Sequence, residues 1–112
     1  MTSTIAGRVP TEQLSSVPWS PKVDSRRAAT FTSFALTAAA EALLDAGWKP
    51  EHQTSRERTG VAIGSGMSSA SDMAEAGRLL KGGQGRRISP YFIPRILVNM
   101  AAGAVSMEYG FR

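Results

Sequence analysis

No cysteine occurs in the 112 residues of this chain, and histidine occurs once, as His52. Without cysteine the chain cannot form a disulfide, a thiolate metal site or an iron–sulfur cluster, and it supplies no cysteine nucleophile. A single histidine excludes a site that needs two histidine ligands. Because His52 lies in a polar stretch among charged residues, we expect a solvated loop histidine rather than a general base. We therefore predict neither a metal nor a cofactor.

Long apolar runs are also absent. No run approaches the ~20 residues that a membrane-spanning helix needs, so we expect no membrane partner. The start of the chain, MTSTIAGRVP, lacks the apolar stretch of a signal peptide and the arginine-rich amphipathic pattern of a transit peptide. We therefore expect no targeting segment in this sequence.

Basic residues, by contrast, are abundant. The net charge is +4, and ten of the 13 basic residues are arginine. Such a balance suggests an acidic partner, which could be nucleic acid, an anionic membrane surface or an acidic protein. An ordinary basic surface would explain the same charge, and a nucleic-acid-binding domain would rest on charge alone.

Length and composition predict one small globular domain, since 42% of the residues are hydrophobic and 20% are charged. Residues 1–25 contain three prolines and many serines and threonines, which predicts an extended or loop-like segment. Residues 26–46 predict a helix, capped by Asp24 or Ser25 and ended by Gly47. Six residues of this helix repeat at helical spacing on one face, and the small alanines among them predict close packing on a neighbouring element. The six residues are Phe31, Ala35, Ala38, Ala39, Ala42 and Ala46.

Three further elements are predicted. Residues 59–64 form a short apolar run bounded by glycine, which is typical of a buried parallel strand. Residues 71–80 predict a helix that ends at two glycines. Residues 94–109 predict a third helix that starts with a proline and is apolar on nearly every side. Such a helix must be buried on several sides, which indicates that the chain is incomplete or needs a partner.

The glycine turn after the predicted strand could suggest two kinds of site. A dinucleotide site would need a third glycine where Ser69 stands, and it would need a second strand with an acidic end. A nucleophilic Ser65 would need glycine two positions earlier, where Ile63 stands. Both interpretations are disfavoured, and a small-residue turn is the better one.

The sequence resembles a known family in several stretches. GVAIGSGM at 60–67 and GGQGRRISPYFIPRILVNMAAGAVSMEYGFR at 82–112 resemble the β-ketoacyl-acyl carrier protein synthases. FALTAAAEALLDAGW at 34–48 is similar to the helix that precedes the strand in that family. IAGRVP, at 5–10, together with FIPRILVNMAAG and YGFR, is similar to the mitochondrial, fungal-type branch. Ser68 and Ser69 depart from the family, which often has glycines there.

The resemblance implies an α/β fold, namely a partial thiolase-like fold that corresponds to a fragment of the N-terminal half. Residues 1–25 would be an extended segment, and residues 26–112 a partial β-ketoacyl synthase N-terminal domain. The family's nucleophilic cysteine, its two histidines and its lysine would all lie beyond Arg112, so His52 takes no catalytic role. We expect the 112 residues alone to be inactive. Members of the family are normally homodimers, and the branch implies a mitochondrial location, with a cytoplasmic one otherwise.

The activity that the resemblance implies is decarboxylative condensation of an acyl thioester with malonyl-acyl carrier protein in fatty acid biosynthesis. The alternative is a non-catalytic ketosynthase-like module, or a truncated isoform, that docks on a full-length synthase. In either case acyl carrier protein is the expected partner, and no nucleic acid is expected.

Two groups of residues carry these expectations. Met67, Phe92 and Ile93 match family positions that line the acyl channel, although all three could be plain core residues. Two basic clusters match segments around the mouth of the family's active site, where acidic acyl carrier protein would dock, although they could be solvated charges. These basic residues are Lys22, Arg26, Arg27, Arg86 and Arg87.

Overall fold

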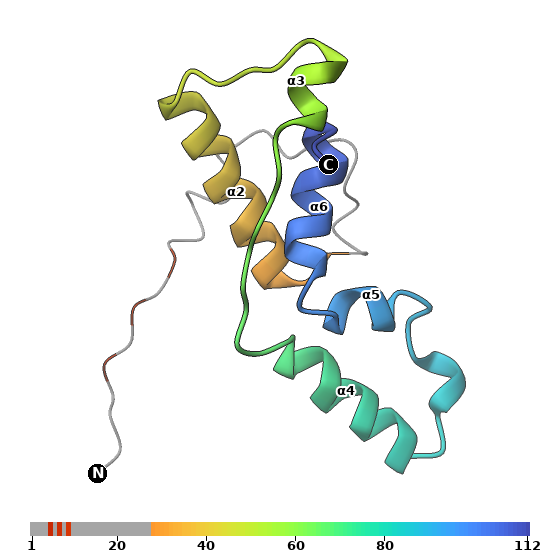
Figure 1. Ribbon diagram of the computed structural model, residues 1–112. Helices are drawn as coiled ribbons and strands as arrows, with labels where there is room; N and C mark the ends of the chain where they lie inside the picture. Colours follow the sequence, from red (N-terminus) through yellow and green to blue (C-terminus); the bar gives the residue numbers. More distant parts are fainter. Residues whose placement is uncertain (1–4, 6, 8, 10–27) are drawn as a thin grey trace.

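The computed structural model describes Ile5, Gly7, Val9 and residues 28–112. Those residues form helices joined by loops (Figure 1). In chain order the elements are α2 (Thr30–Asp45), α3 (Gln53–Glu57), α4 (Ala70–Lys81), the 3₁₀ helix η1 (Gly85–Arg87), α5 (Phe92–Ile96) and α6 (Met100–Tyr109). None of the helices in this part of the chain is long and apolar enough to cross a membrane.

Helix α2 confirms the first predicted helix, although it begins at Thr30 rather than at residue 26. The predicted caps lie outside the described residues. At the other end, Gly47 adopts a φ of +60°, and the Trp48 N–H donates to the Leu43 carbonyl oxygen at 3.0 Å. This is the left-handed glycine ending that the sequence predicted, because glycine reaches positive φ without a steric penalty.

Helices α2 and α6 lie side by side and form what we call the helical layer (Figure 1). The α6 side of the contact is small, with Ala101, Ala104 and Val105 all buried. On α2 the buried residue is Thr32, whereas Ala38, Ala42 and Ala46 of the predicted packing face are exposed. The predicted face is therefore wrong for those three residues. Because α2 is apolar on most sides, its sequence does not mark which side meets α6.

Helix α4 confirms the second predicted helix. The Ser69 hydroxyl caps it by accepting a hydrogen bond from the Asp72 N–H at 3.4 Å. Ala76 and Leu79 form its buried stripe, three residues apart on one face. The helix ends at Gly82, and Gly83 follows with a φ of +68°.

The predicted strand at residues 59–64 is wrong, because the described residues contain no strand. The segment is a loop in which Val61 and Ile63 are half-buried while Ala62 and Gly64 are exposed. This alternation is that of a strand, but a strand also needs a neighbouring chain to bond. Here Arg112 supplies one backbone hydrogen bond, from its N–H to the Thr59 carbonyl oxygen at 3.2 Å. The α/β expectation is therefore not met within the described part of the chain, which is helical.

The predicted helix at residues 94–109 is also wrong as a single element. Leu97 adopts an extended conformation (φ −75°, ψ 120°) and separates α5 from α6. The break lets the two helices meet different neighbours, since α5 contacts α4 while α6 packs on α2. One face of α6 is buried in this chain, and Met107 on another face is 59% exposed.

Candidate functional site

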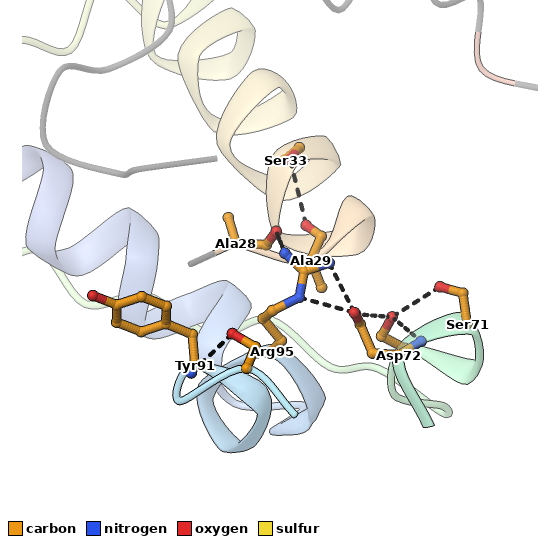
Figure 2. Close-up of polar contacts among 9 residues, drawn as sticks. Ala28, Ala29, Ser33, Ser71, Asp72, Tyr91 and Arg95 are labelled. Carbon is orange, nitrogen blue, oxygen red and sulfur yellow. Dashed lines mark hydrogen bonds and ion pairs between the residues drawn. The ribbon is translucent and has the colours of Figure 1, made fainter. Parts of the chain in front are cut away.

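A polar corner forms where the start of α2, the start of α4 and helix α5 meet (Figure 2). We define it by Ala28, Ser69, Asp72 and Arg95. The Arg95 guanidinium donates from Nε to Asp72 Oδ1 at 2.9 Å, and its Nη2 lies 2.9 Å from the same oxygen. Its Nη1 donates to the Ala28 carbonyl oxygen at 2.7 Å. One side chain on α5 therefore joins two elements that are distant in sequence.

Both carboxylate oxygens of Asp72 have defined partners. Oδ1 accepts from Arg95, and Oδ2 accepts from the Ser69 hydroxyl. Burial by itself raises the pKa of Asp72, but the hydrogen bonds from Arg95 and Ser69 outweigh it and hold the pKa below its ordinary value. The side chains of Arg95 and Asp72 are only 23% and 21% exposed, so water screens this pair less than it screens a surface pair.

A contrasting ion pair lies further along α4, between Glu75 and Arg78. Arg78 donates from Nε to Glu75 Oε2 at 2.8 Å and from Nη2 to Glu75 Oε1 at 2.6 Å. The side chains are 67% and 55% exposed, and both belong to the same helix. The bonds from Arg78 lower the pKa of Glu75. This pair ties α4 to itself, whereas Arg95 ties α4 to the rest of the chain.

The predicted acyl-pocket residues lie around this corner but do not form one cavity. Phe92 lines a small cavity of about 60 Å³ against α4, together with Leu79, Ile88 and Arg95. Ile93, the next residue of α5, is 56% exposed, and Met67 in the loop before α4 is 72% exposed. Neither Met67 nor Ile93 lines that cavity, so the acyl channel stays a prediction.

The predicted docking residues are placed in part. Arg86 and Arg87 lie in η1, after the C-terminal end of α4, and both are exposed. Arg87 donates from Nη1 to Gln84 Oε1 at 3.1 Å. Lys81, which the sequence analysis did not select, is exposed in the last turn of α4. Lys22, Arg26 and Arg27 lie outside the described residues.

A larger cavity, of about 460 Å³, lies at the far end of the helical layer, between the end of α2, α3 and the end of α6. Its apolar walls include Leu43, Trp48, Tyr109 and Phe111, and the rings of Tyr109 and Phe111 stack at 5.5 Å. Burial, and then the charge of Glu108, raise the pKa of Tyr109. The cavity contains none of the predicted site residues. Among the described residues, no group of histidine, cysteine, aspartate and glutamate could hold a metal ion.

Sequence reasoning missed the polar corner. It selected neither Asp72 nor Arg95 as a site residue. A signal was present, because Arg95 is the one charged residue in the apolar stretch YFIPRILVNMAAG. An arginine in such a stretch needs a carboxylate or carbonyl partner when the stretch packs.

Comparison with known proteins places this geometry in context. The family model described as beta-ketoacyl synthase, N-terminal domain, matches residues 2–112. A relative from Arabidopsis thaliana, "3-oxoacyl-[acyl-carrier-protein] synthase, mitochondrial", is 51% identical over 90 residues, which are 80% of this chain and 20% of that protein. A putative mitochondrial synthase of the same name from Schizosaccharomyces pombe is 47% identical over 87 residues, 77% of this chain and 20% of that protein.

A solved structure has the same fold over most of the described region. The crystal structure of a beta-ketoacyl synthase from Burkholderia phymatum covers 84% of this chain and 23% of its own, with a TM-score of 0.69 at 24% sequence identity. The chain thus spans about a fifth of the length of the curated relatives that it matches. The arrangement of its helices is similar to one found within that much longer protein.

Proposed function

The chain belongs to the beta-ketoacyl synthase family, matched through its N-terminal domain, and from that premise we propose that it forms part of a 3-oxoacyl-[acyl-carrier-protein] synthase. The observation that carries the proposal is the 51% identity over 80% of the chain to a synthase of that name. The reaction is the condensation of an acyl thioester with malonyl-acyl carrier protein, with loss of carbon dioxide, in fatty acid biosynthesis. We accordingly propose that the chain forms one part of a thiolase-like α/β fold.

We propose that the reacting groups of the synthase lie outside these 112 residues. Acyl transfer to an enzyme needs an activated nucleophile and donors for the thioester oxyanion. The 112 residues hold no cysteine, so a thiolate nucleophile would have to come from outside them. We therefore propose that this chain supplies acyl-binding and docking surfaces rather than the reacting groups.

The acyl-binding surface that we propose consists of Met67, Phe92 and Ile93. The exposed side chains of Met67 and Ile93 support it, because large apolar residues that face outward can bind an alkyl chain. Each methylene buried against them would stabilise the complex by about 0.8 kcal/mol.

The docking surface that we propose consists of Lys22, Arg26, Arg27, Arg86 and Arg87, with acyl carrier protein as the acidic partner. Arg86 and Arg87 support it through their exposure beside Lys81, which makes the end of α4 strongly basic. We further propose a homodimer and, from the two mitochondrial relatives, a mitochondrial location.

A segment exchange tests the proposal. The segment of the Arabidopsis synthase that aligns with this chain is replaced by the corresponding residues of this chain, which gives a chimaeric synthase. We expect the chimaeric synthase to condense acyl-acyl carrier protein with malonyl-acyl carrier protein at a rate within about tenfold of its parent, since the segment carries no reacting group.

The 112-residue chain alone is the negative control and should give no turnover. A folded, soluble chimaeric synthase without condensing activity would refute the proposed function. If the isolated chain were then found to bind and alter a full-length synthase, the alternative of a non-catalytic docking module would be favoured.

A further inference from the structure

Helix α5 depends on other elements of the fold for its position. It spans five residues, Phe92–Ile96, and so short a helix is not stable in isolation. An extended residue, Leu97, follows it, and Tyr91 precedes it without a side-chain cap. The position of α5 must therefore come from contacts with other elements.

Arg95 supplies the polar contacts that fix α5 to the rest of the fold. Its bonds to Asp72 reach across 23 residues, and its bond to Ala28 reaches across 67. Figure 2 shows the guanidinium between the start of α2 and the start of α4. Three donors in a planar fork allow only a narrow range of positions, because each bond depends on both distance and angle.

The geometry of α5 links Arg95 to the residues beside it. Phe92 and Arg95 are three positions apart, so they share a face, and both line the cavity against α4. Ile93 points from a different face of the same short helix and is 56% exposed. Any rotation of α5 that released Arg95 would move Phe92 and Ile93 together.

We propose that Arg95 is a positioning residue for acyl binding, which sets the placement of Phe92 and Ile93 by anchoring α5 to Asp72 and to the Ala28 carbonyl oxygen. The inference rests on the proposed function, since it takes Phe92 and Ile93 to line the acyl channel. A long acyl chain would contact this wall over several methylenes, whereas a short chain would contact it little. Arg95 therefore governs discrimination between acyl lengths.

A merely structural role makes a different prediction. If Arg95 only stabilised the fold, its loss would reduce the amount of active enzyme and lower kcat equally for every acyl length. A positioning role instead changes the ratio of kcat/KM for long and short acyl chains. The ratio does not depend on how much enzyme is folded.

The test uses the chimaeric synthase with decanoyl and butyryl primers on acyl carrier protein. We expect Arg95→Ala to lower the decanoyl-to-butyryl ratio of kcat/KM about tenfold, with the butyryl value changed less than about threefold. Asp72→Asn removes the charge but keeps the bond to Ala28, so it should have a smaller effect in the same direction. Arg95→Lys keeps the charge but loses the planar fork, and should restore part of the ratio.

Arg78→Ala is the matched control, because Arg78 also makes two bonds to a carboxylate but only within α4. We expect it to leave the ratio unchanged.

If Arg95→Ala, soluble and folded, kept the parent ratio, the positioning role would be wrong while the proposed function stood. An inactive parent chimaeric synthase would instead count against the proposed function. If Arg95→Ala failed to fold, Asp72→Asn and Arg95→Lys would decide, and unchanged ratios in both would overturn the inference.

Discussion

The helices of this molecule are held together by apolar packing in the helical layer and by hydrogen bonds in the polar corner. In the layer, α6 meets α2 through small apolar side chains, with Ala101 1% and Ala104 2% exposed. In the corner, α4, α5 and the start of α2 meet through one arginine and its oxygen acceptors. Apolar contact is non-directional and depends on volume, whereas hydrogen bonds depend on angle and distance.

This difference shows that packing between helices stabilises the fold, whereas directional bonds set the position of α5. The layer sets how closely two helices approach. The corner places α5 against the start of α4 and against Ala28 through the directional bonds of Arg95. We therefore expect changes in the layer to lower the stability of the protein and, with it, the activity on every substrate alike. Changes around the corner should alter the discrimination among substrates.

The largest effect is expected from overfilling the layer with Ala104→Leu. The added carbons have no space at a position that is 2% exposed, so the helices must separate. We expect the free energy of unfolding of the chimaeric synthase to fall by about 2–3 kcal/mol, and activity to fall equally for long and short acyl chains. Thermal and denaturant unfolding measure the first, and initial rates measure the second.

Met107→Leu provides the control for this change, since Met107 lies on the same helix but is 59% exposed. Its stability should stay within about 0.5 kcal/mol of the parent. If Ala104→Leu were equally neutral, the layer would not be closely packed.

The second effect, in order of size, is the stability lost on Arg95→Ala. The change removes the bonds to Asp72 and to Ala28, and it leaves the Asp72 carboxylate partly buried beside a neutral residue. We expect a loss of about 2 kcal/mol in the free energy of unfolding. Arg78→Ala, which breaks an exposed pair, should leave the free energy of unfolding close to that of the parent. Equal losses for the two variants would remove the distinction between corner and surface.

The third effect concerns Met67 in the loop that leads into α4. If Met67 gates the acyl channel, Met67→Gly should lengthen the preferred acyl chain and Met67→Trp should shorten it. Each should change the ratio of kcat/KM for decanoyl and butyryl primers by about tenfold, which corresponds to nearly two methylenes of contact. Identical product profiles for the two variants would show that Met67 is not a gate.

The fourth effect is charge reversal in η1, which follows the C-terminal end of α4. Rim charges tune the rate of association and its dependence on salt more than they tune the chemistry. We expect Arg86→Glu with Arg87→Glu to raise the KM for acyl carrier protein substrates about fivefold at low salt, and less at high salt. The kcat with a small thioester analogue should stay nearly the same. Equal losses on both substrates would indicate structural damage rather than lost docking.

The sequence predicted elements whose signals are local and missed features that depend on distant partners. Helix α4 has its own cap, stripe and glycine stop, so its limits were predicted within one residue. The end of α2 at Gly47 was likewise predicted, because a positive φ there requires glycine. Membership of the family was predicted from stretches such as FIPRILVNMAAG and is confirmed by the match over residues 2–112.

The strand at 59–64 and the single helix at 94–109 failed for a physical reason. A strand exists only with a bonded neighbour, and the described residues give this segment a single bond from Arg112. The break at Leu97 separates two helices whose neighbours differ, since α5 contacts α4 while α6 packs on α2, and the local apolar pattern could not reveal those contacts. The same dependence explains why the polar corner was missed.

The smallest effect is the response of the corner to acid. Arg95 and Ser69 hold the pKa of Asp72 below its ordinary value of 3.8, even though burial opposes them. A carboxyl group whose pKa is lowered by folding contributes stability above its unfolded pKa and loses it as the pH falls through the folded pKa. Asp72 should therefore contribute fully at neutral pH and progressively less below about pH 3.8. Glu75, whose pKa Arg78 also lowers, adds a change of the same sign from the exposed side of α4. Unfolding of the chimaeric synthase measured from neutral pH into acid should thus show a shallower loss of stability for Asp72→Asn than for the parent. Parallel curves for the two proteins would mean that the ion pair of Asp72 with Arg95 contributes nothing to stability, and the contrast between corner and layer would then be one of geometry alone.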